Sequence, residues 1–175
     1  MNQSALIVVV PEAEPLVGSL RSRFDPSALV GMPAHITVLF PFMPVERLTA
    51  DILGKLGTVI GGFVEFDFSL ERIERFPQTT YLAPEPPEPF AAITAALARE
   101  FPDYPPYGGR FSSSIPHLTV ADRNEVFAEV AARELADVRS QRGGVHAICR
   151  AVMLFEKSHD GRWRDYDAFA LKRRA

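Results

Sequence analysis

The pattern of apolar and polar positions predicts strands and helices that alternate along the chain. A continuous apolar run at residues 5–10 is typical of a buried strand. Residues 12–24 have helical spacing, and the prolines at positions 11 and 15 suit the opening turns of a helix. The other expected strands are 34–40, 63–76, 79–83, 117–121, 145–157 and 163–171, and the other expected helices are 49–60, 88–100 and 124–136.

The boundaries of these elements carry signals of their own. Thr49 and Asn124 have side-chain oxygens that can cap the first turn of a helix. Glycine pairs at 61–62 and 143–144 end the elements before them. Four prolines within 84–89 predict a stiff connector, and the sequence Asp160-Gly161 predicts a hairpin turn between the last two strands.

Two of the expected strands begin with nearly the same four residues. His35, Ile36, Thr37 and Val38 open one strand, and His117, Leu118, Thr119 and Val120 open the other. Because side chains two positions apart in a strand share a face, each strand presents an imidazole and a hydroxyl on one side and two apolar groups on the other. Two such faces brought together would form a polar cleft.

The elements that follow the two motifs come in a similar order, which indicates an internal repeat with units starting near 34 and 116. Phe76 and Phe155 also follow the two histidines at similar intervals, each near a strand end. We therefore expect one α+β domain over residues 1–175. It would consist of two pseudo-symmetric lobes, each a mostly antiparallel sheet with helices on its outer face, and the active cleft would lie between them.

Composition narrows the class of protein. The chain has 175 residues, of which 47% are hydrophobic and 23% charged, as in an ordinary soluble domain with a core of its own. Its net charge of −3 argues against binding along an extended nucleic-acid backbone. The single cysteine, Cys149, excludes an internal disulfide framework, and the apolar run at 5–10 is too short for a signal peptide or a membrane span. Cytoplasmic residence without membrane association is expected.

Two histidines beside two threonines suit phosphate ester chemistry. An imidazole gives or accepts a proton near neutral pH, so one ring can act as a general base while the other acts as a general acid. Threonine hydroxyls can donate hydrogen bonds to the non-bridging oxygens of a phosphate. Each motif supplies one good metal ligand, whereas zinc takes three or four, so no metal or other cofactor is expected. The serine run at 112–114 lacks the glycines of a hydrolase nucleophile elbow.

This twin pattern resembles the 2H phosphoesterase superfamily, specifically its 2′-5′ RNA ligase-like group. The sequences around Tyr81, Phe101 and 105–109, and the proline at 116, also fit that group's layout. The resemblance implies metal-independent hydrolysis of cyclic phosphodiesters, with His35 and His117 as catalytic residues and Thr37 and Thr119 as phosphate contacts. Members of the group act on 2′,3′-cyclic phosphates at RNA ends, on ADP-ribose cyclic phosphate or on 2′-5′ linked oligonucleotides. A small cyclic nucleotide or an RNA terminus is therefore the expected partner, with reverse 2′-5′ RNA ligation as a second activity of the group.

Further candidates could recognise the rest of a nucleotide. Aromatic rings near the cleft can stack on a base, and arginines beside the second motif can meet a phosphate, although burial in the core is the common alternative for such rings. We select Phe40, Tyr81, Tyr107 and Arg110 as substrate-binding candidates; Phe42, Phe76, Phe155 and Arg123 are further possibilities. His146 and His159 lack a threonine two positions later, so we interpret both as structural or surface residues.

Other interpretations stay open at this point. The motif faces could be ordinary polar strand faces. A non-catalytic protein that binds nucleotides or RNA ends could use the same cleft, and so could a phosphodiesterase acting on acyl or lipid substrates. The sequence does not decide which histidine is the acid and which the base. A monomer is expected.

Overall fold

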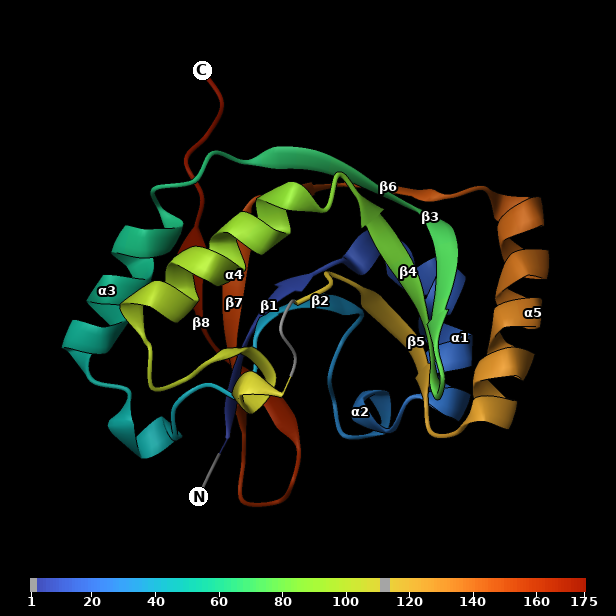
Figure 1. The fold of residues 1–175 in the computed structure, drawn as a ribbon, viewed down its shortest axis with the longest axis horizontal. Helices are drawn as coiled ribbons and strands as arrows, with labels where there is room; N and C mark the ends of the chain where they lie inside the picture. Colours follow the sequence, from blue (N-terminus) through green and yellow to red (C-terminus); the bar gives the residue numbers. More distant parts are fainter. Residues whose placement is uncertain (1–2, 111–113) are drawn as a thin grey trace.

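The computed structural model describes residues 3–110 and 114–175, which form a curled antiparallel sheet with helices packed against it (Figure 1). The strands lie in the order β6-β3-β4-β5-β2-β1-β7-β8, and every pairing between them is antiparallel. The strands are β1 (Ser4–Val9), β2 (His35–Leu39), β3 (Phe66–Phe76), β4 (Thr79–Glu85), β5 (Leu118–Asp122), β6 (Val145–Cys149), β7 (Ala151–Lys157) and β8 (Trp163–Ala170). The helices are α1 (Glu14–Phe24), α2 (Pro26–Leu29), α3 (Ala50–Ile60), α4 (Glu88–Glu100) and α5 (Glu125–Arg142), with short 3₁₀ turns at Pro11–Ala13, Val45–Arg47 and Pro106–Gly109.

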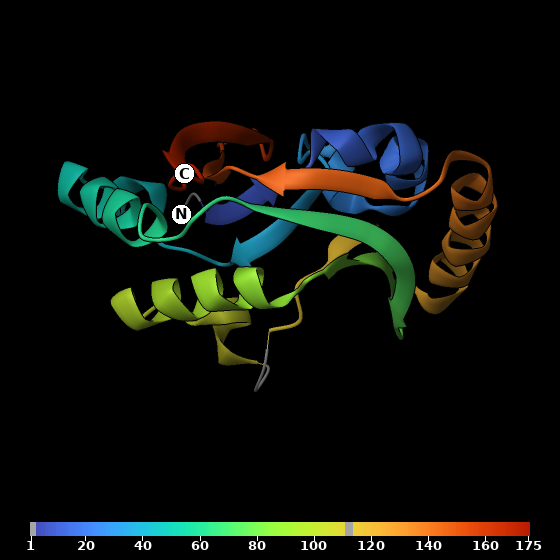
Figure 2. The ribbon, with the colours of Figure 1, turned by 90° about the horizontal axis from the view of Figure 1, so that it is seen from above.

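The two motif strands, β2 and β5, are neighbours in the middle of this sheet. Ile36 pairs with Leu118, and this contact joins the half β6-β3-β4-β5 to the half β2-β1-β7-β8. Figure 2 shows how the sheet curls between α3 at one end of the molecule and α5 at the other. The α+β fold with antiparallel halves is thus confirmed, and the two expected lobes are the two halves of one continuous sheet.

One face of the sheet packs against the helices and forms the main core. Alternate residues of the strands are fully buried on this face, as the period of two predicts. Each such side chain contributes about 1.5–3 kcal/mol when it is fully buried. The strands supply, among others, Leu6, Val8, Ile36, Leu82, Leu118, Val120 and Leu154, and the helices supply Val17, Leu20, Leu56, Ile60, Phe90, Ile93, Leu97, Ala131 and Leu135.

The opposite face carries a second, smaller apolar cluster. Ile7 of β1, Phe155 of β7 and Trp163 of β8 are buried there together with Met32, and Phe40 packs against them. His35 and Thr37 are half-buried on this same face, because they alternate along β2 with the core residues Ile36 and Val38. The smaller cluster therefore borders the motif residues.

The expected helix signals are confirmed at three places. The hydroxyl oxygen of Thr49 accepts a hydrogen bond from the Ile52 amide at 3.3 Å and caps α3. The side-chain oxygen of Asn124 accepts from the Phe127 amide at 2.8 Å and caps α5. Helix α4 has the expected bounds, 88–100.

Two expectations near the sheet edges are wrong. Residues 145–157 form two strands, not one long strand: β6 pairs with β3 at one edge, and β7 pairs with β1 and β8 at the other. The chain passes from β6 to β7 at Arg150. The apolar pattern continues through this point, so it does not show that the neighbouring strands change there. Strand β4 continues to Glu85 through Pro84, which pairs with Leu70, and the proline-rich connector therefore starts inside the sheet.

The end of the second repeat unit also differs from the first. Strand β4 lies beside the motif strand β5, whereas β8 lies at the outer edge of the sheet beyond β7. The position next to the motif strand β2 is taken instead by β1. Helix α5 reaches Arg142 rather than residue 136, because its glycine stop, Gly143, comes only there.

Gly31 lies in the turn before the first motif and should not tolerate a side chain. Its φ is +95°, and a Cβ atom would lie 2.8 Å from the backbone oxygen of Trp163. We expect Gly31→Ala to lower the free energy of unfolding by about 1–3 kcal/mol. Gly54→Ala is the matched control, because a Cβ atom at this helix position meets nothing within 4 Å and should stabilise by about 0.5–1 kcal/mol. Urea denaturation measures both changes, and an unchanged Gly31→Ala midpoint would contradict the argument.

Candidate active site

The pairing of β2 with β5 determines how the four motif side chains face one another. Ile36 lies opposite Leu118. Continuing this antiparallel register by one residue in each direction puts His35 across from Thr119, and Thr37 across from His117. Opposite residues have Cβ atoms about 4.5–5.5 Å apart, and diagonal neighbours such as the two histidines are about 7–8 Å apart. Each histidine therefore lies across the strand pair from the threonine of the other motif.

All four motif residues line one cavity of about 580 Å³. This volume is within the usual range for small-molecule sites, about 300–1,000 Å³. A second cavity of about 620 Å³ adjoins it and shares Tyr107, His117 and Asp122 with it. The second cavity is otherwise lined by Phe76, Pro77, Gln78, Thr79 and Ile115.

The two imidazoles are held by equivalent hydrogen bonds. Nδ1 of His35 lies 2.7 Å from the carbonyl oxygen of Pro33, and Nδ1 of His117 lies 2.7 Å from the carbonyl oxygen of Ile115. A carbonyl oxygen only accepts hydrogen bonds, so Nδ1 carries the hydrogen in both rings. In the neutral rings, Nε2 is then the nitrogen with the lone pair, and it is the atom left for proton transfer.

Burial lowers the pKa of both imidazoles, because the charged form loses its contact with water. The effect is larger at His35, where the pKa falls from 6.5 to about 4. There the Pro33 carbonyl acts in the opposite direction, and the charges of Arg21 and His117 lower the pKa further while Asp25 raises it. At His117 the Ile115 carbonyl and Asp122 both oppose the effect of burial. Both imidazoles are therefore neutral at neutral pH.

His117 has an aromatic environment. Its ring centroid lies 5.4 Å from that of Phe76 in an edge-to-face arrangement and 5.2 Å from that of Tyr81. Tyr81 is only 6% exposed and packs on Phe76 with 4.5 Å between ring centroids. Tyr81 therefore contacts a motif histidine directly, and it is not one of the residues that line the two cavities.

Two other predicted substrate contacts do line the central cavity. Phe40 packs edge-to-face on Trp163 at 6.0 Å. Tyr107 lines both cavities, and its backbone amide donates a hydrogen bond to the Phe40 carbonyl at 2.6 Å. Tyr107 has a φ of +53°, a left-handed conformation that is uncommon outside glycine and is often found at functional sites.

The remaining predicted candidates lie outside the central cavity. Arg110 is exposed at the end of the Pro106–Gly109 turn and lines neither cavity. Arg123 is exposed and lies 5.8 Å over the ring of Phe127. Phe42 is buried against Phe101, and Phe155 is buried in the smaller apolar cluster. Whether any of the aromatic and arginine candidates binds substrate stays a prediction.

Several residues that line the central cavity were missed by the sequence analysis. Asp25 and Ser27 reach it from the start of α2, Asp122 from the end of β5, and Lys157 and Trp163 from the two strands β7 and β8. The sequence Asp25-Pro26-Ser27 signals a helix cap, and Asp25 does accept a hydrogen bond from the Ser27 amide. No local pattern indicates that these positions meet the motif strands, because the sheet order brings them together.

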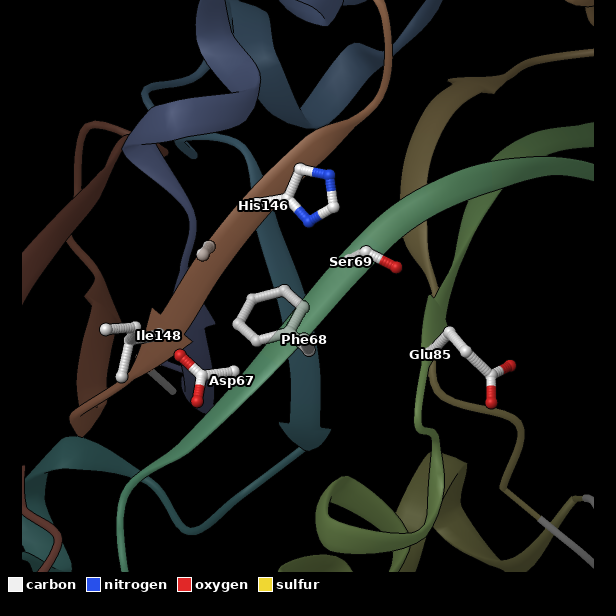
Figure 3. Close-up of a pocket in the computed structure, with 7 residues that line it drawn as sticks. Asp67, Phe68, Ser69, Glu85, His146 and Ile148 are labelled. Atoms are coloured by element: carbon white, nitrogen blue, oxygen red, sulfur yellow. The ribbon is translucent and has the colours of Figure 1, made fainter. Parts of the chain in front are cut away.

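The other two histidines lie away from the motif residues. His146 is exposed in a separate groove on β3 and β6, beside Ser69 (Figure 3). Its Nε2 lies 3.5 Å from a carboxylate oxygen of Glu71. His159 is exposed beside the turn between β7 and β8. Positions 112 and 113 of the serine run lie outside the described residues.

Two general features can be stated for residues 3–110 and 114–175. No group of three or more histidine, cysteine, aspartate or glutamate side chains is arranged there to hold a metal ion. None of the helices in these ranges combines the length and apolar character needed to cross a membrane.

Comparison with known proteins decides the family. The sequence model that describes the 2′-5′ RNA ligase superfamily matches residues 9–160, which are most of the chain. The chain belongs to this superfamily. The twin histidine and threonine motifs of this 2′-5′ RNA ligase superfamily member both lie inside the matched range. A search of curated proteins found no match.

Solved structures of other proteins have the same fold. Escherichia coli LigT in complex with 3′-AMP superposes with a TM-score of 0.60 at 15% identity, covering 98% of each chain. LigT in complex with NADP⁺ gives a TM-score of 0.59 at 16% identity, again covering 98% of each chain. A crystal structure described as a phosphoesterase gives 0.59 at 16% identity, covering 98% of this chain and 99% of the other. At these identities, the likeness shows the fold.

The lowered pKa values predict a loss of stability in acid for this superfamily member. Between pH 6.5 and 4 the unfolded chain binds a proton at His35 that the folded chain does not, and His117 acts in the same direction. The free energy of unfolding should therefore decrease as the pH falls through this window. Urea midpoints at pH 7 and pH 4.5 measure the change, which should be smaller in His35→Gln. An equal change in both proteins would contradict the burial of His35.

Proposed function

We propose that this protein is a metal-independent cyclic phosphodiesterase that acts on 2′,3′-cyclic phosphate ends of RNA or on small cyclic nucleotides. Reverse 2′-5′ RNA ligation is included in the proposal, because hydrolysis and ligation at the same phosphate would use the same proton transfers. The observation that carries the proposal is the shared cavity of His35, His117, Thr37 and Thr119. Two imidazoles with equivalent Nδ1 anchors and two hydroxyls are the groups that this reaction needs.

The proposed hydrolysis needs one neutral and one protonated imidazole. The neutral ring takes a proton from water at Nε2 while the water oxygen bonds to phosphorus. The protonated ring gives its proton to the sugar oxygen as the bond from that oxygen to phosphorus breaks. Thr37 and Thr119 donate hydrogen bonds to the non-bridging oxygens, on which negative charge builds up.

Substrate binding would lead one ring to take up the missing proton from solvent. Burial favours the neutral form of both imidazoles, because it lowers both pKa values. An anionic phosphate between the rings raises the pKa of each by direct attraction. The catalytic acid would therefore be charged together with the arrival of substrate.

The surroundings of the motif residues suit a nucleotide. Phe40 and Trp163 form an apolar wall of the cavity on which a base can stack. Among the described residues that line this cavity, Lys157 is the one lysine or arginine. The LigT structures, which share the fold, hold 3′-AMP and NADP⁺, and both ligands are nucleotides of a size that supports this interpretation.

The activity is tested with a panel of substrates: the four 2′,3′-cyclic nucleotides, ADP-ribose 1″,2″-cyclic phosphate and RNA that ends in a cyclic phosphate. We expect turnover of at least one of them in the presence of EDTA. His35→Ala and His117→Ala should each lower kcat by about 10²- to 10⁴-fold, because each removes one proton transfer. His146→Ala is the matched control, since this histidine is exposed in a separate groove.

The same panel separates the proposal from its alternative, a non-catalytic protein that binds nucleotides or RNA ends. Such a protein would bind members of the panel without turning them over, and the alanine variants would change only its affinity. Full inhibition by EDTA would instead contradict the metal-independent mechanism. Turnover restricted to lipid or acyl phosphodiesters would reject the proposed substrate class.

The threonines are tested by a change that removes only the hydroxyl. Valine has nearly the shape of threonine, so Thr37→Val and Thr119→Val should keep the sheet intact. Each loses one hydrogen bond to a charged oxygen, which is worth about 1.5–3 kcal/mol, so kcat/KM should fall about 10- to 100-fold. Steady-state kinetics with the best substrate of the panel measure the loss. Wild-type kinetics in both variants would rule out a phosphate contact.

A further inference from the structure

A buried ion pair lies directly behind the first motif. Arg21 of α1 and Asp25 at the start of α2 are 2% and 3% exposed. Two guanidinium nitrogens of Arg21 donate to Oδ2 of Asp25 at 2.8 and 3.0 Å. The other carboxylate oxygen of Asp25 accepts from the amide and the hydroxyl of Ser27 at 2.9 and 2.7 Å. Both oxygens of the carboxylate are thus fully used.

Arg21 of this pair and the nearby Glu14 fix the backbone on the two sides of Pro33. Arg21 donates through Nη2 to the carbonyl oxygen of Met32 at 3.1 Å. Glu14, whose carboxylate lies 3.9 Å from Nη1 of Arg21, accepts a hydrogen bond from the Ala34 amide at 2.7 Å. The residues immediately before and after Pro33 are therefore both bound by charged side chains, and the proline ring restricts the backbone between them.

Pro33 in turn holds the catalytic candidate His35, whose Nδ1 donates to the Pro33 carbonyl at 2.7 Å. We propose that Arg21, Asp25 and Glu14 form a positioning network that fixes the backbone around Pro33 and thereby the orientation of the His35 ring. The equivalent carbonyl at the second motif belongs to Ile115. Within the described part of the chain, no buried ion pair supports Ile115 in this way.

A purely stabilising role explains the pair less well. Two buried charges lose their hydration, and apolar residues of similar volume often give equal or greater stability. Asp25 also lines the same cavity as His35, so the pair lies next to the site and not deep in the core. A small misplacement of a catalytic ring costs up to about 100-fold in rate, which gives rigid support a functional value.

The network also places opposite charges near His35. The guanidinium of Arg21 lowers the pKa of His35, and the carboxylate of Asp25 raises it. His117, immediately before β5, is the other titratable group that acts on His35, and its positive form lowers the pKa of His35. Removing one member of the ion pair should therefore shift the pKa of His35 in a direction that depends on the charge removed.

The test uses Arg21→Met, Asp25→Asn and the double variant, with Arg23→Met as the matched control. Arg23 lies on the same helix, but it is exposed and pairs with Glu134 on the surface. NMR titration of the imidazole carbons and nitrogens gives the pKa and the tautomer of His35 without any substrate. We expect Arg21→Met to raise the pKa of His35, Asp25→Asn to lower it, and Arg23→Met to leave it unchanged.

The double variant separates position from charge. It loses one positive and one negative charge, so the two effects on the pKa oppose each other, while the hydrogen bond to the Met32 carbonyl is still missing. We expect a mixed tautomer at His35 and a kcat that is 10- to 100-fold lower, with KM nearly unchanged. Arg21→Lys serves as a second variant that keeps the charge in the core if Arg21→Met does not fold. In Arg21→Lys the pKa of His35 should stay lowered as in wild type, because the positive charge remains. The value of kcat should still fall, because lysine lacks the planar fork of arginine.

The NMR results stand on their own, and only the kinetic measurements rest on the proposed function. A wild-type protein without phosphodiesterase activity would reject that function and leave the test of the network intact. The proposal is overturned if the folded double variant keeps the pure Nδ1–H tautomer of His35. Equal pKa shifts in Arg21→Met and Asp25→Asn would overturn it as well.

Discussion

The pairing of Ile36 with Leu118 is the contact on which the rest of the molecule depends. It joins the two halves of the sheet and brings together two motifs that are far apart in the sequence. Both residues are fully buried, so the apolar side of each motif holds the register that presents the polar side. A slip of one residue in either strand would turn the histidine and the threonine of that strand toward the core. Core packing and site geometry are therefore two faces of the same four-residue motif.

Burial of the two imidazoles has a cost and a use. It keeps both rings uncharged in the free protein, because their pKa values are lowered. An anion in the cavity would reverse this, so binding and protonation are linked, and each favours the other. The Nδ1 anchors at Pro33 and Ile115 add direction to this chemistry, since they leave the same nitrogen of both rings for the substrate.

The sequence predicted the parts of the structure that depend on local rules. The bounds of α4 and the caps at Thr49 and Asn124 follow from side chains close in the sequence. The split of 145–157 into two strands was not predictable in this way, because the apolar pattern of β6 and β7 records burial and not the neighbouring strand. The same holds for the site. The spacing of His35 and Thr37 in the sequence identifies them as site residues. The order of the strands in the sheet, which the sequence does not show, brings other residues to the same cavity: Asp25, Lys157 and Trp163.

The crossing at Arg150 has a consequence for how the chain folds. Strand β1, the first to be made, takes β7 as its second neighbour, and β3 takes β6, so both halves of the sheet wait for the last quarter of the chain. Pairings of such wide sequence separation close large loops before they gain contacts, so we expect folding in the range typical of sheet-rich domains, about milliseconds to seconds. During synthesis, the first motif would be complete while the edge of β1 that pairs with β7 still lacks its partner strand. The site therefore matures late, only when the carboxyl-terminal strands have docked on both sides.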